Sequence, residues 1–175
     1  MTTRLVEALA QTKIGATFNQ YADSPLLRER LAAYLDRRRA APILLVGEAA
    51  GYRGARVSGI PFTSERQLTG AGPAEATATI VHRAIDDLGL TAHVLLWNVV
   101  PTHPGTERSN RLPTRSEVDA SAPFLAELAA GRWVIPVGRV AHGCLGGPYV
   151  RHPSHGGAAG FHAGLAAALR YAGLG

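Results

Sequence analysis

Residues 41–62 read APILLVGEAAGYRGARVSGIPF, and this stretch decides how the chain is expected to fold. Its apolar run, Ile43 to Val46, ends at Gly47 and is followed at once by a carboxylate, Glu48. Such a run is typical of a strand buried on both faces of a parallel sheet. Ligands of open α/β sheets bind just beyond the carboxyl ends of the strands. The glycine-rich loop after the run, which closes on Phe62, is therefore expected to carry a reaction site.

Further strands and helices are predicted on either side of this stretch. Apolar runs predict strands over residues 92–100, 132–137 and 149–152. The amphipathic N-terminal segment and residues 25–39, 74–88, 116–130, 138–145 and 157–171 have helical patterns. Strands that alternate with helices favour a three-layer α/β/α sandwich around a four-stranded parallel sheet. We expect residues 1–175 to form one domain, with the loops after its four strands at one edge of the sheet.

The charge balance points to a polyanionic partner. The chain has 18 basic and 13 acidic side chains, a net charge of +5, and 17 of the basic residues are arginines. A protein with an isoelectric point of about 10.0 is attracted to polyanions, and nucleic acid is the first among them. Genome composition explains the preference for arginine over lysine equally well, but it does not explain the sign of the charge.

Composition also excludes several classes of protein. No apolar run approaches the roughly 20 residues that span a bilayer, and the N-terminal segment lacks the apolar core and cleavage site of a signal peptide. We therefore predict a cytoplasmic protein without a membrane partner. The single cysteine, Cys144, allows neither a disulfide framework nor a thiolate metal cluster within the chain.

Glu48 and His152 are the first candidates for chemistry. The loop around Glu48 lacks the spacing of a P-loop or a dinucleotide fold, so this carboxylate either orients water and stabilises a cation, or caps a backbone turn. His152 precedes Pro153 at a predicted strand end, where a neutral imidazole could donate to an oxyanion. A metal site shared with His155 is disfavoured, because the proline removes the helical geometry that would align the two rings.

Two further side chains have both a structural and a functional interpretation. Asn98 lies in the apolar run LLWNVVP, and a buried asparagine needs hydrogen-bond partners, either in a neighbouring loop or in a ligand. Phe62 either belongs to the core or stacks on a flat heterocycle. Trp97 and Trp133 lie inside predicted strands and are expected in the core.

Taken together, these motifs resemble the uracil-DNA glycosylase superfamily, and most closely its thermostable, iron–sulfur-containing branch. The similarity extends over about residues 42–169, with the motifs in the same order and at similar spacing. The matching segments are Gly47 to Gly51, Gly59 to Phe62, Asn98 to Val100, Asn110 to Thr114 and His152 to Ser154.

The resemblance implies a role for each matching side chain. Glu48 would position water and offset positive charge on the sugar, and His152 would stabilise the departing uracil anion. Phe62 would stack on the extruded base, while Asn98 would read the uracil edge. Breaking an N-glycosidic bond forms a cation-like sugar and an anionic base, so a carboxylate and a hydrogen-bond donor are both needed.

The chain departs from that branch in three ways. Thr102 and Ser121 stand where two cluster cysteines would be, so we predict no cofactor and no metal. Gly47 and Ala49 are expected to contact substrate beside Glu48, but Ala49 offers no side chain where other branches carry aspartate or asparagine. The segment after His152 also lacks a bulky apolar side chain that would fill the stack after base flipping.

From the resemblance we predict a monomeric, cluster-free enzyme that hydrolyses uracil from single- or double-stranded DNA. The alternatives are a non-catalytic binder of damaged or abasic DNA and a hydrolase of free nucleosides. A positive net charge disfavours the second alternative, since a nucleoside needs no polycation. The residues expected to contact DNA are Arg53, Arg56, Arg111, Arg151, Ser154 and His155.

Overall fold

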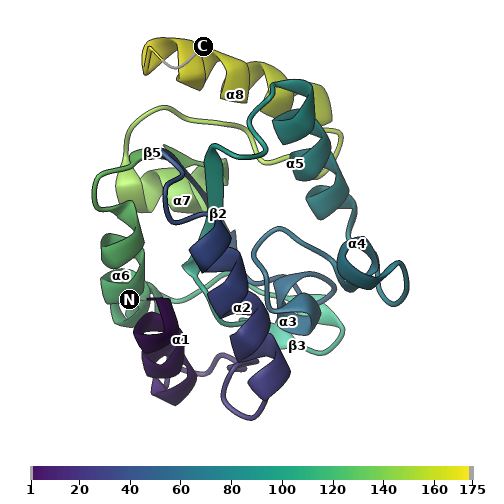
Figure 1. Cartoon of the computed structure of the whole chain (residues 1–175), viewed down its shortest axis with the longest axis vertical. Coiled ribbons are helices and arrows are strands. Elements are labelled where there is room, and N and C mark those ends of the chain that lie inside the picture. The colour runs from purple at the N-terminus through teal and green to yellow at the C-terminus, as the bar shows by residue number, and fades with distance from the viewer. Residues whose placement is uncertain (1, 174–175) are drawn as a thin grey trace.

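A parallel sheet forms the centre of the protein. The computed structural model describes residues 2–173 (Figure 1). Its main sheet contains β1 (Ile43–Ala49), β2 (Val94–Val100) and β5 (Trp133–Pro136), in the order β2-β1-β5 and all parallel. Ile43 of the central strand pairs with Val94 on one side and Trp133 on the other. The predicted α/β fold with a parallel sheet is therefore confirmed.

The predicted fourth strand, over residues 149–152, is wrong. This segment makes one isolated parallel bridge, between Val150 and Val137. Val150 accepts a hydrogen bond from the Gly138 amide at 2.8 Å and donates one to Pro136 at 3.2 Å. Pro148 and Pro153 enclose the segment and have no N–H group to donate, so the pairing does not extend. The main sheet thus has three strands in the described residues, with Val150 beside its β5 edge.

The helices agree with the predicted patterns to within a few residues. They are α1 (Thr2–Gln11), α2 (Pro25–Arg37), α5 (Ala76–Asp87), α6 (Arg115–Ala129), α7 (Gly138–Leu145) and α8 (Ala158–Tyr171). Two short helices, α3 (Ala55–Ser58) and α4 (Glu65–Thr69), were not predicted. Nor was a small hairpin, β3 (Gly105–Thr106) with β4 (Ser109–Asn110). None of the helices in residues 2–173 is long and apolar enough to cross a membrane.

The helices pack around the sheet in pairs and against its strands. Helix α6 lies against β2, α7 against β1, and α1 against α2, while α5 and α8 lie together near the C-terminus (Figure 1). Side chains also tie α2 to the sheet. At the open edge of β2 the Leu96 amide donates to the Tyr34 hydroxyl at 2.7 Å, which satisfies a buried backbone group. Burial raises the pKa of Tyr34 to about 12, and the hydrogen bond from Leu96 offsets part of that rise.

Candidate active site

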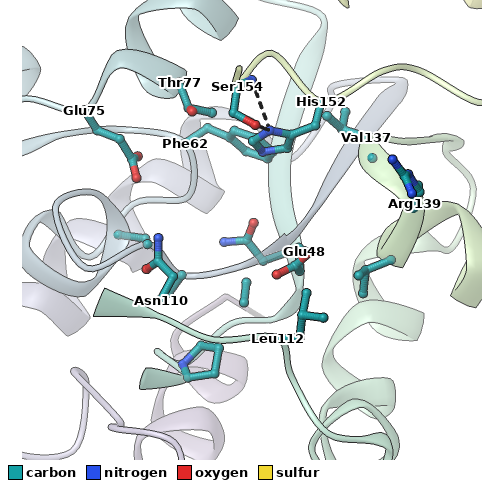
Figure 2. A pocket seen from close by; sticks show the side chains of 18 of the residues that line it. Glu48, Phe62, Glu75, Thr77, Asn110, Leu112, Val137, Arg139, His152 and Ser154 are labelled. Atoms are coloured by element: carbon teal, nitrogen blue, oxygen red, sulfur yellow. Dashed lines mark hydrogen bonds between the residues drawn. The ribbon is translucent and has the colours of Figure 1, made fainter. Parts of the chain in front are cut away.

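The four loops that follow β1, β2, β5 and the Val150 bridge enclose one pocket. Figure 2 shows side chains that line this pocket, and its volume is about 700 Å³. The pocket lies beyond the carboxyl ends of the parallel strands, which is where the sheet topology predicts a ligand. Among the residues proposed from the sequence, those that line it are Glu48, Ala49, Phe62, Asn98, Arg111, Arg151, His152, Ser154 and His155.

Glu48 lies near the carboxyl end of the central strand, β1. The apolar residues before it are fully buried, whereas Glu48 and Ala49 are only partly buried because the strand emerges into the pocket here. Burial raises the pKa of the Glu48 carboxyl. Its carboxylate has no hydrogen-bond partner among residues 2–173, so it is free to accept a proton or a hydrogen bond from a ligand or water.

Gly47, Phe62 and Asn98 form a closely packed floor. A Cβ atom at Gly47 would overlap the Phe62 ring and lie 2.8 Å from Oδ1 of Asn98, so only glycine fits between them. Phe62 has a backbone φ of +52°, a region that bulky side chains rarely adopt. Backbone strain of this kind clusters at functional sites. Although Gly47 does not line the pocket itself, it lets two candidate substrate contacts approach each other.

The Asn98 amide favours ligand recognition over a structural tie. Asn98 is buried, yet within the described part of the chain its side chain makes no hydrogen bond. A tie between loops would require such a partner, and the Asn98 amide atoms are not among the fully enclosed polar atoms without one, so they reach the open space of the pocket. Because Asn98 also lines the pocket, a ligand with complementary donors and acceptors would meet this requirement.

The hydrogen bonds of His152 select one tautomer. The Ser154 amide donates to Nδ1 of His152 at 3.2 Å, and the Ser154 hydroxyl lies 2.7 Å from the same nitrogen (Figure 2). Nδ1 is therefore an acceptor, and the proton of the neutral ring is assigned to Nε2. Burial lowers the pKa of His152, and the nearby His155 lowers it further. The ring is held as a neutral donor at the pocket.

The pocket also contains residues that the sequence analysis did not select. Glu75, which precedes α5, points its carboxylate toward the pocket (Figure 2) and has its pKa raised by burial. Asn110 accepts a hydrogen bond from the Tyr52 amide at 3.0 Å, which joins the β4 hairpin to the glycine-rich loop. Arg139, Thr77, Leu112 and Tyr149 also line the pocket. Asn110 and Leu112 lie in the motif of residues 110–114, whereas the positions of the others depend on how distant segments pack.

The arginines predicted to contact DNA fall into two groups. Arg56 is paired with Glu107 at 3.2 Å and lies 4.8 Å from the centre of the Phe18 ring, outside the pocket. Arg53 lies over the Tyr52 ring and does not line the pocket either. Arg151 does line it and has no carboxylate partner among residues 2–173.

Arg111 and His155 are in the pocket but are already held by other groups. Arg111 makes a two-pronged ion pair with the buried Glu117, at 2.8 and 2.6 Å. His155 has a positive φ of +53°, and its carbonyl accepts a hydrogen bond from Arg151 at 3.4 Å. Both are therefore fixed parts of the pocket wall, whatever else they contact.

The positions that match cluster cysteines do not fit an iron–sulfur group. Thr102 is buried, and its hydroxyl lies 2.6 Å from that of Thr17. Ser121 is buried too and donates to the Glu117 carbonyl at 2.8 Å. Iron–sulfur clusters are held by thiolates, and these hydroxyls are used within the fold. These two positions therefore offer no ligand for such a cluster.

A carboxylate, an imidazole, an amide and an aromatic ring thus line one pocket at the carboxyl ends of a parallel sheet. The sequence profile of the uracil DNA glycosylase superfamily matches residues 35–166, and the chain belongs to this superfamily. It is therefore a DNA glycosylase, a hydrolase of base excision repair whose family acts on DNA.

A solved structure supports the same fold. The crystal structure of wild-type SMUG2 from Pedobacter heparinus superposes with a TM-score of 0.68 at 13% sequence identity. The match covers 99% of this chain and 97% of that one. No curated protein sequence matches the chain significantly. The particular resemblance to the iron–sulfur branch remains a prediction.

Proposed function

We propose that this protein hydrolyses the N-glycosidic bond of uracil in DNA, with the nucleotide flipped out of the strand into the pocket. One observation carries the proposal. Glu48, Phe62, Asn98 and His152 come from separate segments of the chain and line the same pocket. Flipping is required because the bond is inaccessible inside a base stack, and it costs a few kcal/mol.

In this proposal the base is held by Phe62 and Asn98. The ring of Phe62 provides a flat apolar surface on which the base stacks. The Asn98 amide offers both a donor and an acceptor, which matches the alternating carbonyl and imide groups of uracil. Since Gly47 keeps these two side chains close together, a base that stacks on one is within reach of the other.

Glu48 and His152 act on the two charges that develop as the bond breaks. The bonding electron pair leaves with uracil, the sugar becomes cationic, and water adds to C1′ while Glu48 accepts its proton. A carboxyl with a raised pKa is a stronger base for this step. His152 donates from Nε2 to the anionic oxygen of uracil. Its lowered pKa keeps it a neutral donor that stabilises the anion through a hydrogen bond.

The proposal is tested with labelled oligonucleotides that carry one uracil, as a single strand and in U:G and U:A duplexes. Abasic products are cleaved with alkali and resolved by size. We expect wild-type protein to give cleavage, with losses of roughly 10²–10⁴-fold for Glu48→Gln and about 10²–10³-fold for His152→Ala. Glu127→Gln and His93→Ala change exposed residues outside the pocket and should retain activity.

Three outcomes contradict the proposal. Salt-sensitive DNA binding without release of uracil would identify a non-catalytic DNA binder. Turnover of free deoxyuridine without DNA affinity would identify a nucleoside hydrolase. Full activity in the Glu48→Gln, His152→Ala double variant would refute the assignment of both residues.

A further inference from the structure

Leu112 is an exposed aliphatic side chain at the pocket. It lies between β4 and α6 and lines the pocket (Figure 2). Its exposed fraction is 68%. Isolated exposed leucines are common on protein surfaces, so exposure alone has no meaning. Leu26 and Leu68 are also exposed, at 54% and 40%, but neither lines the pocket. Leu112 differs from them in its place beside the candidate catalytic residues.

The backbone that carries Leu112 is held rigidly. On one side, Arg111 is bound by both carboxylate oxygens of Glu117, and its guanidinium also donates to the Leu112 carbonyl at 3.0 Å. On the other side, Pro113 fixes its own φ, and the Thr114 amide donates to Glu117 at 2.8 Å. A side chain that inserts between stacked bases must stay in position, and the fixed backbone on both sides of Leu112 would hold it there.

The segment after His152 does not offer a comparable side chain. It continues with Ser154 and His155 and then with two glycines. A Cβ atom at Gly157 would overlap the His152 carbonyl, so that position has no room for a larger residue. Tyr149 is the other exposed apolar residue of the pocket, but its ring is packed edge-on against His142 at 5.4 Å.

We propose that Leu112 inserts into the base stack of double-stranded DNA and fills the space that the flipped nucleotide leaves. This inference rests on the proposed function, and it implies that the natural substrate is double-stranded DNA. Proteins that unstack DNA commonly insert leucine or another apolar side chain between base steps. The exposed leucine loses contact with water in this complex, and Arg139 and Arg151 are in place to contact the neighbouring phosphates.

The test compares Leu112→Ala with wild type on one uracil sequence, as a single strand and as U:A and U:G duplexes. We expect kcat/KM to fall roughly tenfold on the U:A duplex, less on U:G, and under about twofold on the single strand, because only a duplex has a stack to refill. Leu112→Phe should keep the duplex activity. Leu26→Ala is the matched control on a distant helix and should equal wild type.

A second readout measures flipping without cleavage. In the Glu48→Gln background, a 2-aminopurine next to the uracil should brighten on binding of duplex DNA, and Leu112→Ala should remove most of this increase. Equal losses on single-stranded and duplex DNA, or loss of duplex activity in Tyr149→Ala but not in Leu112→Ala, would refute the insertion while base excision stands. Absence of uracil release by wild type from every substrate would instead refute the proposed function.

Discussion

Gly47 controls how closely Phe62 and Asn98 approach the end of β1. We expect Gly47→Ala to force the Phe62 ring aside, and to destabilise the protein by about 1–3 kcal/mol, as overpacked substitutions do. Base excision should fall as well, because both proposed base contacts move. The measurement is urea unfolding together with the uracil release assay.

Gly143→Ala is the matched control for this substitution. Gly143 lies inside α7, and a Cβ atom there meets nothing within 4 Å. Alanine in a helix interior stabilises by roughly 0.5–1 kcal/mol over glycine, so this variant should be slightly more stable and fully active. A Gly47→Ala protein as stable and active as Gly143→Ala would show that the floor of the pocket is loose.

The ionised Glu48 carboxylate is expected to lower the stability of the fold at neutral pH. Its pKa is raised by burial in the folded state, so folding favours the protonated form. This favourable contribution is present at low pH and is lost as pH rises through the folded pKa. Glu48→Gln should therefore melt at a higher temperature than wild type at pH 7.5, and the difference should shrink near pH 4.

Glu127→Gln is the control variant for these melting experiments. Glu127→Gln removes an exposed carboxylate outside the pocket, and it should shift the melting temperature little at either pH. A Glu48→Gln variant that is less stable than wild type at pH 7.5 would indicate that the carboxylate is satisfied in the fold, and not held ready for a substrate.

At the scale of elements, the Arg111–Glu117 pair holds the β4 hairpin to the start of α6. Glu117 is 1% exposed and accepts hydrogen bonds from Arg111, Thr114 and Ala16. We expect Glu117→Gln to cost about 2–3 kcal/mol in urea unfolding, because it leaves charged and backbone donors poorly matched. Asp119→Asn breaks only the exposed pair with Arg115 and should cost less than about 1 kcal/mol.

The pH dependence of this pair has the opposite sign to that of Glu48. The Arg111 hydrogen bonds hold the pKa of Glu117 down to about 2, so the pair stabilises the fold above the ordinary glutamate pKa of about 4.3. The stability gap between wild type and Glu117→Gln should narrow as pH falls from 5 toward 2. A constant gap over that range would mean that the charge contributes nothing.

The elements that local pattern determines were predictable from the sequence. Helix α7 begins and ends where its pattern predicts, and β1 and β2 follow their apolar runs. The segment around Val150 was not predictable, because its apolar residues lie between prolines and pair with β5 at one position. The β3–β4 hairpin was not predictable because it lies in a polar loop without the apolar pattern that marks a strand.

The candidate site divides in the same way. Glu48, Asn98 and His152 lie at or near the carboxyl ends of the strands predicted from the sequence, and a parallel sheet brings such ends together. Glu75 reaches the pocket only because the start of α5 packs beside it, which no local spacing indicates, and the motif of residues 110–114 did not show that Leu112 is exposed there. The ion pair of Arg56 with Glu107 was not predictable either, since it joins residues 51 positions apart in the chain.

At the level of the whole molecule, the net charge of +5 can attract DNA best where arginines have no carboxylate partner. Arg139 and Arg151 line the pocket without a carboxylate partner in the described residues, whereas Arg56 is paired. In DNA binding, Arg139→Ala and Arg151→Ala should each reduce the slope of log K against log salt by about 0.7–0.9, since each removes one phosphate contact.

Arg83→Ala provides the comparison for this charge prediction. Arg83 is highly exposed on α5 and lies 3.8 Å from Asp87, away from the pocket. Its loss changes the net charge by the same amount and should leave the slope within error of wild type. An equal change of slope in all three variants would mean that overall charge, and not the pocket mouth, binds DNA.

We propose that one pocket releases uracil from DNA through Glu48. The most direct test is the amount of free uracil, measured by mass spectrometry, that wild type and Glu48→Gln release from a single-stranded oligonucleotide with one deoxyuridine. We predict stoichiometric release by wild type and a loss of roughly 10²–10⁴-fold in rate for the variant. Release at equal rates by both proteins, or no release by either, would contradict the proposed role of Glu48 in uracil release.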